Sequence, residues 1–100
     1  MRYLGDGLGP TALVRGASPP RILYPVDETS LILPPQGRAV MLEAEGGRRP
    51  LTWIVNGEPL ERSGASRRLG WTPDGIGFNE IVLVDALGRR AAARVRLVPQ

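Results

Sequence analysis

The most reactive protein side chains are missing from this sequence, which contains no cysteine, no histidine and no lysine. Their absence excludes thiol nucleophiles, Cys/His zinc sites, Ser-His-Asp arrangements, and Schiff-base or Ser-Lys chemistry. All 13 cationic side chains are therefore arginines, whose guanidinium forks match carboxylates and phosphates. The sequence predicts a protein that is not an enzyme, with no cofactor and no bound metal.

Pairs of adjacent arginines are the strongest candidates for ligand binding. There are three such pairs, Arg48-Arg49, Arg67-Arg68 and Arg89-Arg90. In an immunoglobulin-like strand order the first pair lies in the B–C loop and the third at the F–G hairpin, and these loops lie at one end of the sandwich. We therefore take Arg48, Arg49, Arg89 and Arg90 as a candidate site for an anionic partner. The alternative is that these arginines only keep a loop-rich end soluble.

The ten acidic residues are scattered along the chain. Glu43 and Glu45 share one face of an expected strand, but such carboxylate pairs are common on strands that face solvent. Asp27-Glu28 and Asp74-Gly75 lack the spaced oxygen ligands of a calcium loop. Asp85 lies at an expected hairpin, and we interpret it as a turn-stabilising side chain rather than a catalyst.

Two further features resemble binding motifs. Trp53 and Trp71 have rings able to stack on a sugar, but a sandwich with two tryptophans and one phenylalanine needs them in its core. The glycine-rich segment at residues 5–9 resembles a phosphate-binding loop only superficially. It lacks a preceding strand, a following helix and any lysine, so we assign it to a flexible loop.

The composition and the positions of turn-forming residues indicate which elements hold these residues in place. The chain has 100 residues, of which 42% are apolar, enough for one domain and no second core. Residues 1–20 show no sustained periodicity and end in Ser18-Pro19-Pro20. We predict that they form a linker or leader, with at most one weak strand at 11–14. The alternative is that they add an edge strand to the fold.

From residue 21 onward, short apolar runs alternate with turn residues. The pattern predicts an all-β fold, an immunoglobulin-like β-sandwich of about seven strands over residues 21–98. Asn56-Gly57 suits a tight hairpin turn, and Pro59 places the returning strand at a sheet edge. Strands are expected at 22–24, 31–33, 39–45, 51–55, 58–60, 67–71, 78–85 and 91–98. The expected core consists of Val40, Leu42, Trp53, Leu69, Ile81, Leu83, Val95 and Leu97.

Charge and hydropathy exclude two classes of partner. The net charge is +3, with six arginines against five acids in residues 1–50 and seven against five in residues 51–100. Without a clustered basic face interleaved with aromatic residues, we expect no nucleic-acid binding. The longest fully apolar stretches are four residues, against the ~18 that a membrane helix needs, so we expect no direct membrane insertion. If the module works outside the cytoplasm, a longer chain must carry it there.

Four strings in one order resemble the C-terminal domain of bifunctional (class A) penicillin-binding proteins of the 1C type. They are PRILYPVD at residues 20–27, RPLTWIVNG at 49–57, WTPDGIGF at 71–78 and VDALGR at 84–89. The resemblance covers about residues 20–98. Glu28 stands where the family usually has glycine after aspartate, and Asn79-Glu80 replaces a more usual aromatic or basic pair.

The resemblance implies an appendage of an inner-membrane-anchored peptidoglycan synthase, facing the periplasm of a Gram-negative bacterium. The transpeptidase of such enzymes needs Ser-x-x-Lys and Lys-Thr-Gly motifs, so no catalytic residue transfers onto this lysine-free sequence. Two functions stay open. The first is an accessory module that binds or positions the enzyme at peptidoglycan (murein) or at an acidic envelope protein. The second is a purely structural domain that packs on the transpeptidase domain of the parent chain.

Overall fold

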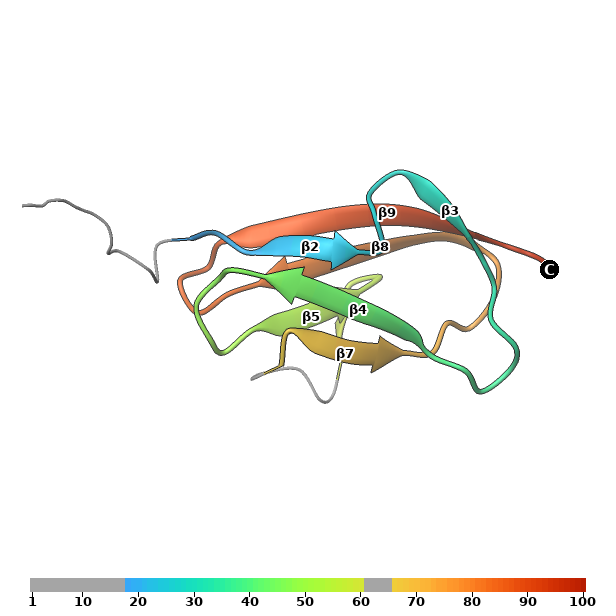
Figure 1. The fold of residues 1–100 in the computed structure, drawn as a ribbon, viewed down its shortest axis with the longest axis horizontal. Coiled ribbons are helices and arrows are strands. Elements are labelled where there is room, and N and C mark those ends of the chain that lie inside the picture. The colour runs from blue at the N-terminus through green and yellow to red at the C-terminus, as the bar shows by residue number, and fades with distance from the viewer. Residues whose placement is uncertain (1–17, 61–65) are drawn as a thin grey trace, which may run out of the picture.

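The structure is a computed structural model that describes residues 18–60 and 66–100. The described strands form two β-sheets that pack face to face (Figure 1). The weak strand expected at 11–14 and the glycine-rich segment at 5–9 lie outside the described residues. Within the described ranges, no helix is long and apolar enough to cross a membrane.

The smaller sheet has three antiparallel strands in the order β2-β4-β7. These strands are β2 (Arg21–Tyr24), β4 (Val40–Glu45) and β7 (Arg68–Trp71). In β4, Leu42 and Ala44 are buried whereas Glu45 is exposed. This alternation is the one expected of a strand with one face on the core.

The larger sheet has five strands in the order β3-β9-β8-β5-β6. They are β3 (Thr29–Ile32), β5 (Thr52–Val55), β6 (Glu58–Pro59), β8 (Gly77–Val84) and β9 (Arg90–Val98). β3 pairs with β9 in parallel, and the other pairs are antiparallel. The strand that contains Pro59 lies at the edge, as predicted, because proline has no N–H to donate to a neighbour.

The space between the sheets is filled by apolar side chains, and Leu51 and Trp53 have no exposed surface. Six of the eight expected core residues are buried. Val40 and Leu69 are half-buried and pack against the core, because Val40 begins β4 and Leu69 lies on the edge strand β7. The Trp53 indole N–H has no hydrogen-bond partner in the described part of the chain.

The two sheets confirm the predicted immunoglobulin-like sandwich, with eight strands in the described ranges instead of about seven. Two turns depend on left-handed backbone. Asn56 and Gly57 have φ of 53° and 86°, as the predicted tight hairpin requires. Glu28 has φ of 62°, and its N–H donates to the carbonyl oxygen of Arg94 at 2.7 Å. The residue that replaces the usual glycine of the resembled family therefore keeps a glycine-like conformation.

Candidate functional site

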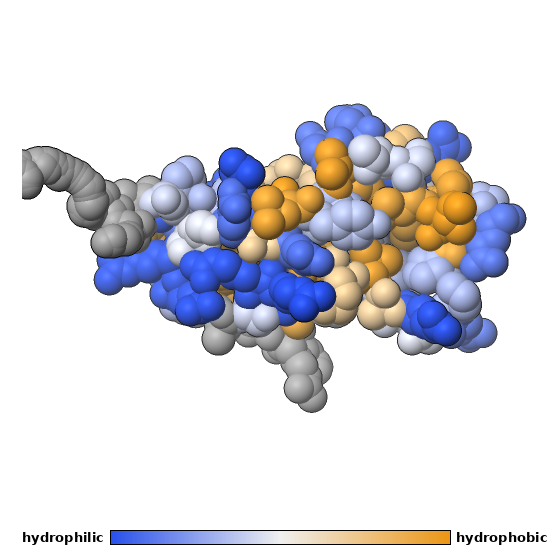
Figure 2. Space-filling view, viewed as in Figure 1, coloured by the Kyte–Doolittle hydropathy of each residue, from blue (hydrophilic) through white to orange (hydrophobic). Residues whose placement is uncertain are grey.

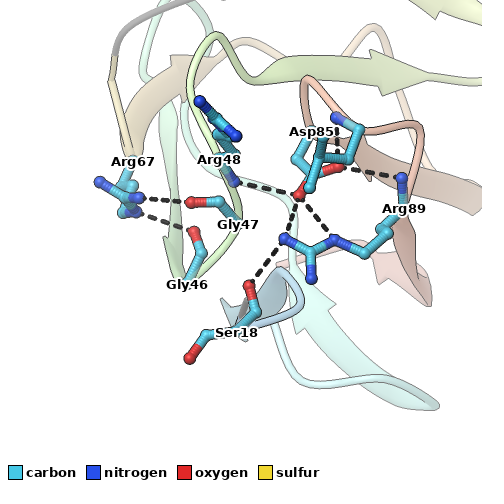
Figure 3. Close-up of polar contacts among 8 residues, drawn as sticks. Ser18, Gly46, Gly47, Arg48, Arg67, Asp85 and Arg89 are labelled. Atoms are coloured by element: carbon cyan, nitrogen blue, oxygen red, sulfur yellow. Dashed lines mark hydrogen bonds and ion pairs between the residues drawn. The ribbon is translucent and has the colours of Figure 1, made fainter. Parts of the chain in front are cut away.

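Asp85 follows β8 and is the one described charged or polar residue classed as buried. Its Oδ1 accepts the backbone N–H groups of Leu87 at 3.0 Å and Arg89 at 2.9 Å. Its Oδ2 accepts the backbone N–H of Arg48 at 3.0 Å, and the Nε and Nη2 of Arg89 at 3.0 and 2.8 Å (Figure 3). The carboxylate thus closes the β8–β9 turn and also binds the β4–β5 loop, so it acts as the turn-stabilising side chain that was predicted.

The pKa of Asp85 reflects this environment. Burial by itself raises the pKa of a carboxyl group, because it disfavours the charged form. Here the hydrogen bonds from Arg48, Arg89 and Leu87 outweigh burial and lower the pKa from its ordinary 3.8 to about 2. Asp85 is therefore ionised at neutral pH, and it lacks the raised pKa that a general acid needs.

The β4–β5 loop is held from its other side by Arg67. The Nε and Nη2 atoms of Arg67 donate to the carbonyl oxygens of Gly46 at 2.9 Å and Gly47 at 2.8 Å (Figure 3). The carbonyl oxygen of Ser18 then accepts the N–H of Gly47 at 2.9 Å and the Nη2 of Arg89 at 3.1 Å. Residues on three separate segments are thereby tied to one loop.

The two loops that carry the predicted arginines do lie side by side at one end of the sandwich (Figure 1). Besides the bond to Asp85, the N–H of Ala86 donates to the carbonyl oxygen of Arg48 at 2.8 Å. On the face drawn in Figure 2, hydrophilic side chains gather over the half nearest these loops, and apolar ones are more frequent over the other half.

The four candidate arginines have different environments. Arg89 is only 29% exposed at its side chain, and its guanidinium binds Asp85 and Ser18. Arg48 uses its backbone N–H for Asp85, while its exposed side chain turns away from that carboxylate (Figure 3). Arg49 and Arg90 are exposed as well, the first next to Arg48 and the second at the start of β9. We call Arg48, Arg49 and Arg90 the loop-end arginines.

Sequence reasoning missed Arg67 and Ser18 as parts of this junction. Both bind through backbone carbonyl oxygens, Arg67 to those of Gly46 and Gly47 and Ser18 through its own. A contact to a backbone carbonyl oxygen can be made at any residue, so no pattern of side chains in the sequence predicts it. The division between a linker at 1–20 and a domain at 21–98 stays a prediction, although Ser18 contacts the β4–β5 loop and Pro20 is buried.

The other candidates have structural roles. Glu45 pairs with Arg21 at 2.9 Å and Glu43 with Arg68 at 3.8 Å, across the outer face of the smaller sheet. Trp53 and Trp71 are buried, at 0% and 7% exposure, as predicted for core residues. In the described ranges, no group of three or more Asp and Glu side chains is placed to hold a metal ion.

An open cleft of about 390 Å³ lies between the β5–β6 hairpin and the β7–β8 loop. Asn56 and Asn79 are among its lining residues. Asn56 Nδ2 donates to Asn79 Oδ1 at 2.9 Å, Asn79 Nδ2 donates to the carbonyl oxygen of Gly77 at 3.2 Å, and Asn56 Oδ1 accepts the N–H of Glu80 at 2.9 Å. These amides are already paired, so they fix the hairpin. This explains Asn79, one of the two departures from the resembled pattern.

Comparison with known proteins bears on both fold and family. Residues 9–97 match the model of the Penicillin-Binding Protein C-terminus Family, while no curated protein matches the chain. The fibronectin(III)-like modules of Clostridium thermocellum CbhA are 13% identical, with a TM-score of 0.59 over 80% of this chain and 96% of that one. The Bacteroides ovatus glucan-utilisation protein SGBP-B, solved with a mixed-linkage heptasaccharide, is 13% identical, with a TM-score of 0.46 over 81% of this chain and 24% of that one. The CbhA likeness confirms the sandwich fold.

Proposed function

The chain belongs to the Penicillin-Binding Protein C-terminus Family, and from this premise we propose that it is a non-catalytic accessory module of a peptidoglycan synthase. In this proposal the loop-end arginines bind carboxylates of murein and so help to place the synthase on its product. The module then works in the periplasm, as part of an inner-membrane-anchored protein, because that compartment contains the murein.

One observation carries the proposal: Asp85 holds the β4–β5 and β8–β9 loops together while it neutralises only Arg89. The exposed side chains of Arg48 and Arg90 are thereby presented on an ordered backbone. Murein stem peptides carry free carboxylates, and a guanidinium binds a carboxylate through two parallel N–H···O bonds. Arg89 is left out of the proposed site, because its guanidinium is already bound to Asp85.

Binding of this kind is expected to be weak. An exposed ion pair contributes at most about 1 kcal/mol, so a few such pairs give an affinity on the order of a millimolar dissociation constant for a single murein fragment. Salt screens exposed charges. Binding to intact sacculi, which present many stem peptides, should therefore be visible at low ionic strength and decline as salt is added.

Co-sedimentation of the chain with purified murein sacculi tests the proposal. We expect Arg48→Gln/Arg90→Gln to reduce the sedimented fraction, and Arg38→Gln/Arg96→Gln to leave it unchanged. The control removes the same charge from exposed positions away from the β4–β5 and β8–β9 loops, one before β4 and one near the end of β9. If both variants lost the same share of the sedimented fraction, sedimentation would depend on general charge attraction and not on the loop-end arginines. No sedimentation of the unmodified chain at low salt would leave only the structural function.

The structural alternative has its own support. Leu23, Tyr24 and Val26, at the end of β2 and just beyond it, are 41%, 42% and 55% exposed. Exposed apolar side chains close together are typical of a surface that another domain covers. If the module packs on the transpeptidase domain through this segment, Leu23→Ser/Val26→Ser should lower the melting temperature of that domain in the full-length synthase. The same change should leave the isolated chain unaffected.

A further inference from the structure

Phe78, the only phenylalanine in the chain, lies on the outer face of the larger sheet and is 61% exposed. The Cζ atom of Arg94 lies 4.3 Å from the centroid of its ring, and that of Arg96 lies 5.6 Å away. Strand register explains the grouping, because Phe78 on β8 is opposite Arg96 on β9, and Glu80 is opposite Arg94. We call Phe78, Arg94 and Arg96 the sheet-face cluster.

The guanidinium groups of this cluster are held in place but not neutralised. Stacking on an aromatic ring restrains a guanidinium and leaves the N–H edge of its plane available. In the part of the chain that the structure describes, neither Arg94 nor Arg96 forms a side-chain ion pair or hydrogen bond. The nearby Asp27 accepts the backbone N–H of Arg94 at 2.8 Å instead. Two donor edges therefore face solvent beside an exposed ring.

Exposed apolar surface extends the face mainly on one side of the cluster. On the β5 side, Ile54 is half-buried and its register partner Val82 is only 6% exposed. At the other end Ile32 is 66% exposed. It lies two residues after Ser30, which pairs with Arg96, so its side chain is on the same outer face as the cluster. Arginine and aromatic side chains are enriched at the centres of protein–protein interfaces.

We propose that the sheet-face cluster binds an extended segment of a partner protein that has two acidic residues two positions apart and a large apolar residue two positions further on, so that all three side chains point to the same face. Its carboxylates would meet the N–H edges of Arg94 and Arg96, and its apolar side chain would cover Ile32 beside the ring of Phe78. Along an extended peptide, alternate side chains face one way at a spacing of about 6–7 Å, which matches two guanidiniums two residues apart on β9. Murein is the weaker fit, because its glycan strands and stem peptides lack large apolar side chains.

The test uses the ¹⁵N-labelled 100-residue chain and a synthetic ten-residue peptide with glutamate at positions 3 and 5, leucine at position 7 and serine elsewhere, which places the three side chains on one face when the peptide is extended. Amide shifts followed by NMR should concentrate at residues 78–80 and 94–96. The same peptide with glutamine in place of glutamate, and a disaccharide-tetrapeptide fragment of murein, should leave these residues unshifted. Arg94→Gln/Arg96→Gln should raise the dissociation constant of the acidic peptide about tenfold, because two exposed charge pairs are lost. Arg38→Gln/Arg68→Gln should leave that constant unchanged.

Several outcomes would overturn this proposal. These are peptide shifts confined to another surface, an unchanged affinity in the Arg94→Gln/Arg96→Gln variant, or stronger shifts from the murein fragment than from the peptide at these residues. The result is independent of murein binding at the loop end. Arg94→Gln/Arg96→Gln should still sediment with sacculi, and Arg48→Gln/Arg90→Gln should still bind the peptide, so each proposal can fail alone.

Discussion

The carboxylate of Asp85 accepts the backbone N–H of Arg48 at 3.0 Å, across 37 positions of sequence. Arg48 lies in the loop that carries the chain from β4 in one sheet to β5 in the other, and Asp85 directly follows β8. A sandwich without cysteine has no disulfide between its sheets. This buried polar junction therefore adds a specific link to the apolar packing of the core.

Asp85→Asn should destabilise the fold strongly. An asparagine with its oxygen toward Leu87 and Arg89 points its NH₂ group at the N–H of Arg48 and at the Arg89 guanidinium, so donors face donors. Buried donors left without an acceptor are costly. We expect a fall in the melting temperature on the order of 10 °C for a domain of this size, measured by circular dichroism.

The matched control for Asp85 is Asp74→Asn in the β7–β8 loop. Asp74 is exposed, so the same chemical change there should move the melting temperature by about 2 °C or less. If the two variants melted at the same temperature, the Asp85 hydrogen bonds would contribute no measurable stability.

Acid should remove the contribution of Asp85 to stability. Its pKa is about 2 in the folded chain against an ordinary 3.8, so the unfolded chain binds more protons between these values. Stability therefore falls as pH is lowered from about 4 to about 2. In urea unfolding at a series of pH values, the difference between the parent chain and Asp85→Asn should be constant above about pH 4 and shrink below it. A difference independent of pH down to 2 would contradict the lowered pKa.

Much of the fold could be predicted, because it depends on sequence patterns that span only a few residues. Alternation in β4 and β9, the Asn56-Gly57 turn and Pro59 are each read within a few residues of sequence. The parallel pairing of β3 with β9 could not be read in this way. It joins strands more than 60 positions apart, and nothing in the short segment Thr29–Ile32 specifies its partner.

The candidate site was predictable only in part, for a related reason. Topology places the arginine-bearing loops together, and this was foreseen. Whether a given guanidinium is available depends on its long-range partners, and for Arg89 one of these is the carbonyl oxygen of Ser18, 71 positions away. The sheet-face cluster was also missed. Alternation with Ile81 and Leu83, which were expected in the core, already places Phe78 on the outer face, but only the register with β9 shows that Arg94 and Arg96 lie beside its ring.

The chain should not react with penicillin. Acylation needs an activated nucleophile such as the serine of Ser-x-x-Lys, and this sequence has no lysine. Incubation with a fluorescent penicillin followed by denaturing electrophoresis should give no labelled band. A stoichiometric, heat-stable adduct would show that the chain contains a nucleophile unlike that of its relatives.

Glu28→Gly should stabilise the fold slightly. Left-handed backbone costs a non-glycine residue about 1–2 kcal/mol, and Glu28 has φ of 62°. Glycine avoids this cost but loses about 0.5–1 kcal/mol through the greater freedom of the unfolded chain. The expected net gain is about 0.5 kcal/mol in urea unfolding at neutral pH. Glu28→Val should be destabilising, because a β-branched residue fits this region worst.

Gly46→Ala tests whether residues 18–20 belong to the folded domain. Gly46 has φ of 71°, and an added methyl group would overlap the carbonyl oxygen of Pro19. Gly37 has φ of 85°, with no atom within 4 Å of the added methyl, so Gly37→Ala carries only the backbone cost of about 1 kcal/mol. If residues 18–20 pack on the β4–β5 loop as part of the domain, Gly46→Ala should cost at least about 2 kcal/mol, because Pro19 must also move. Urea unfolding of the two variants measures the difference, and equal costs would show that these residues are a linker whose contacts add no stability.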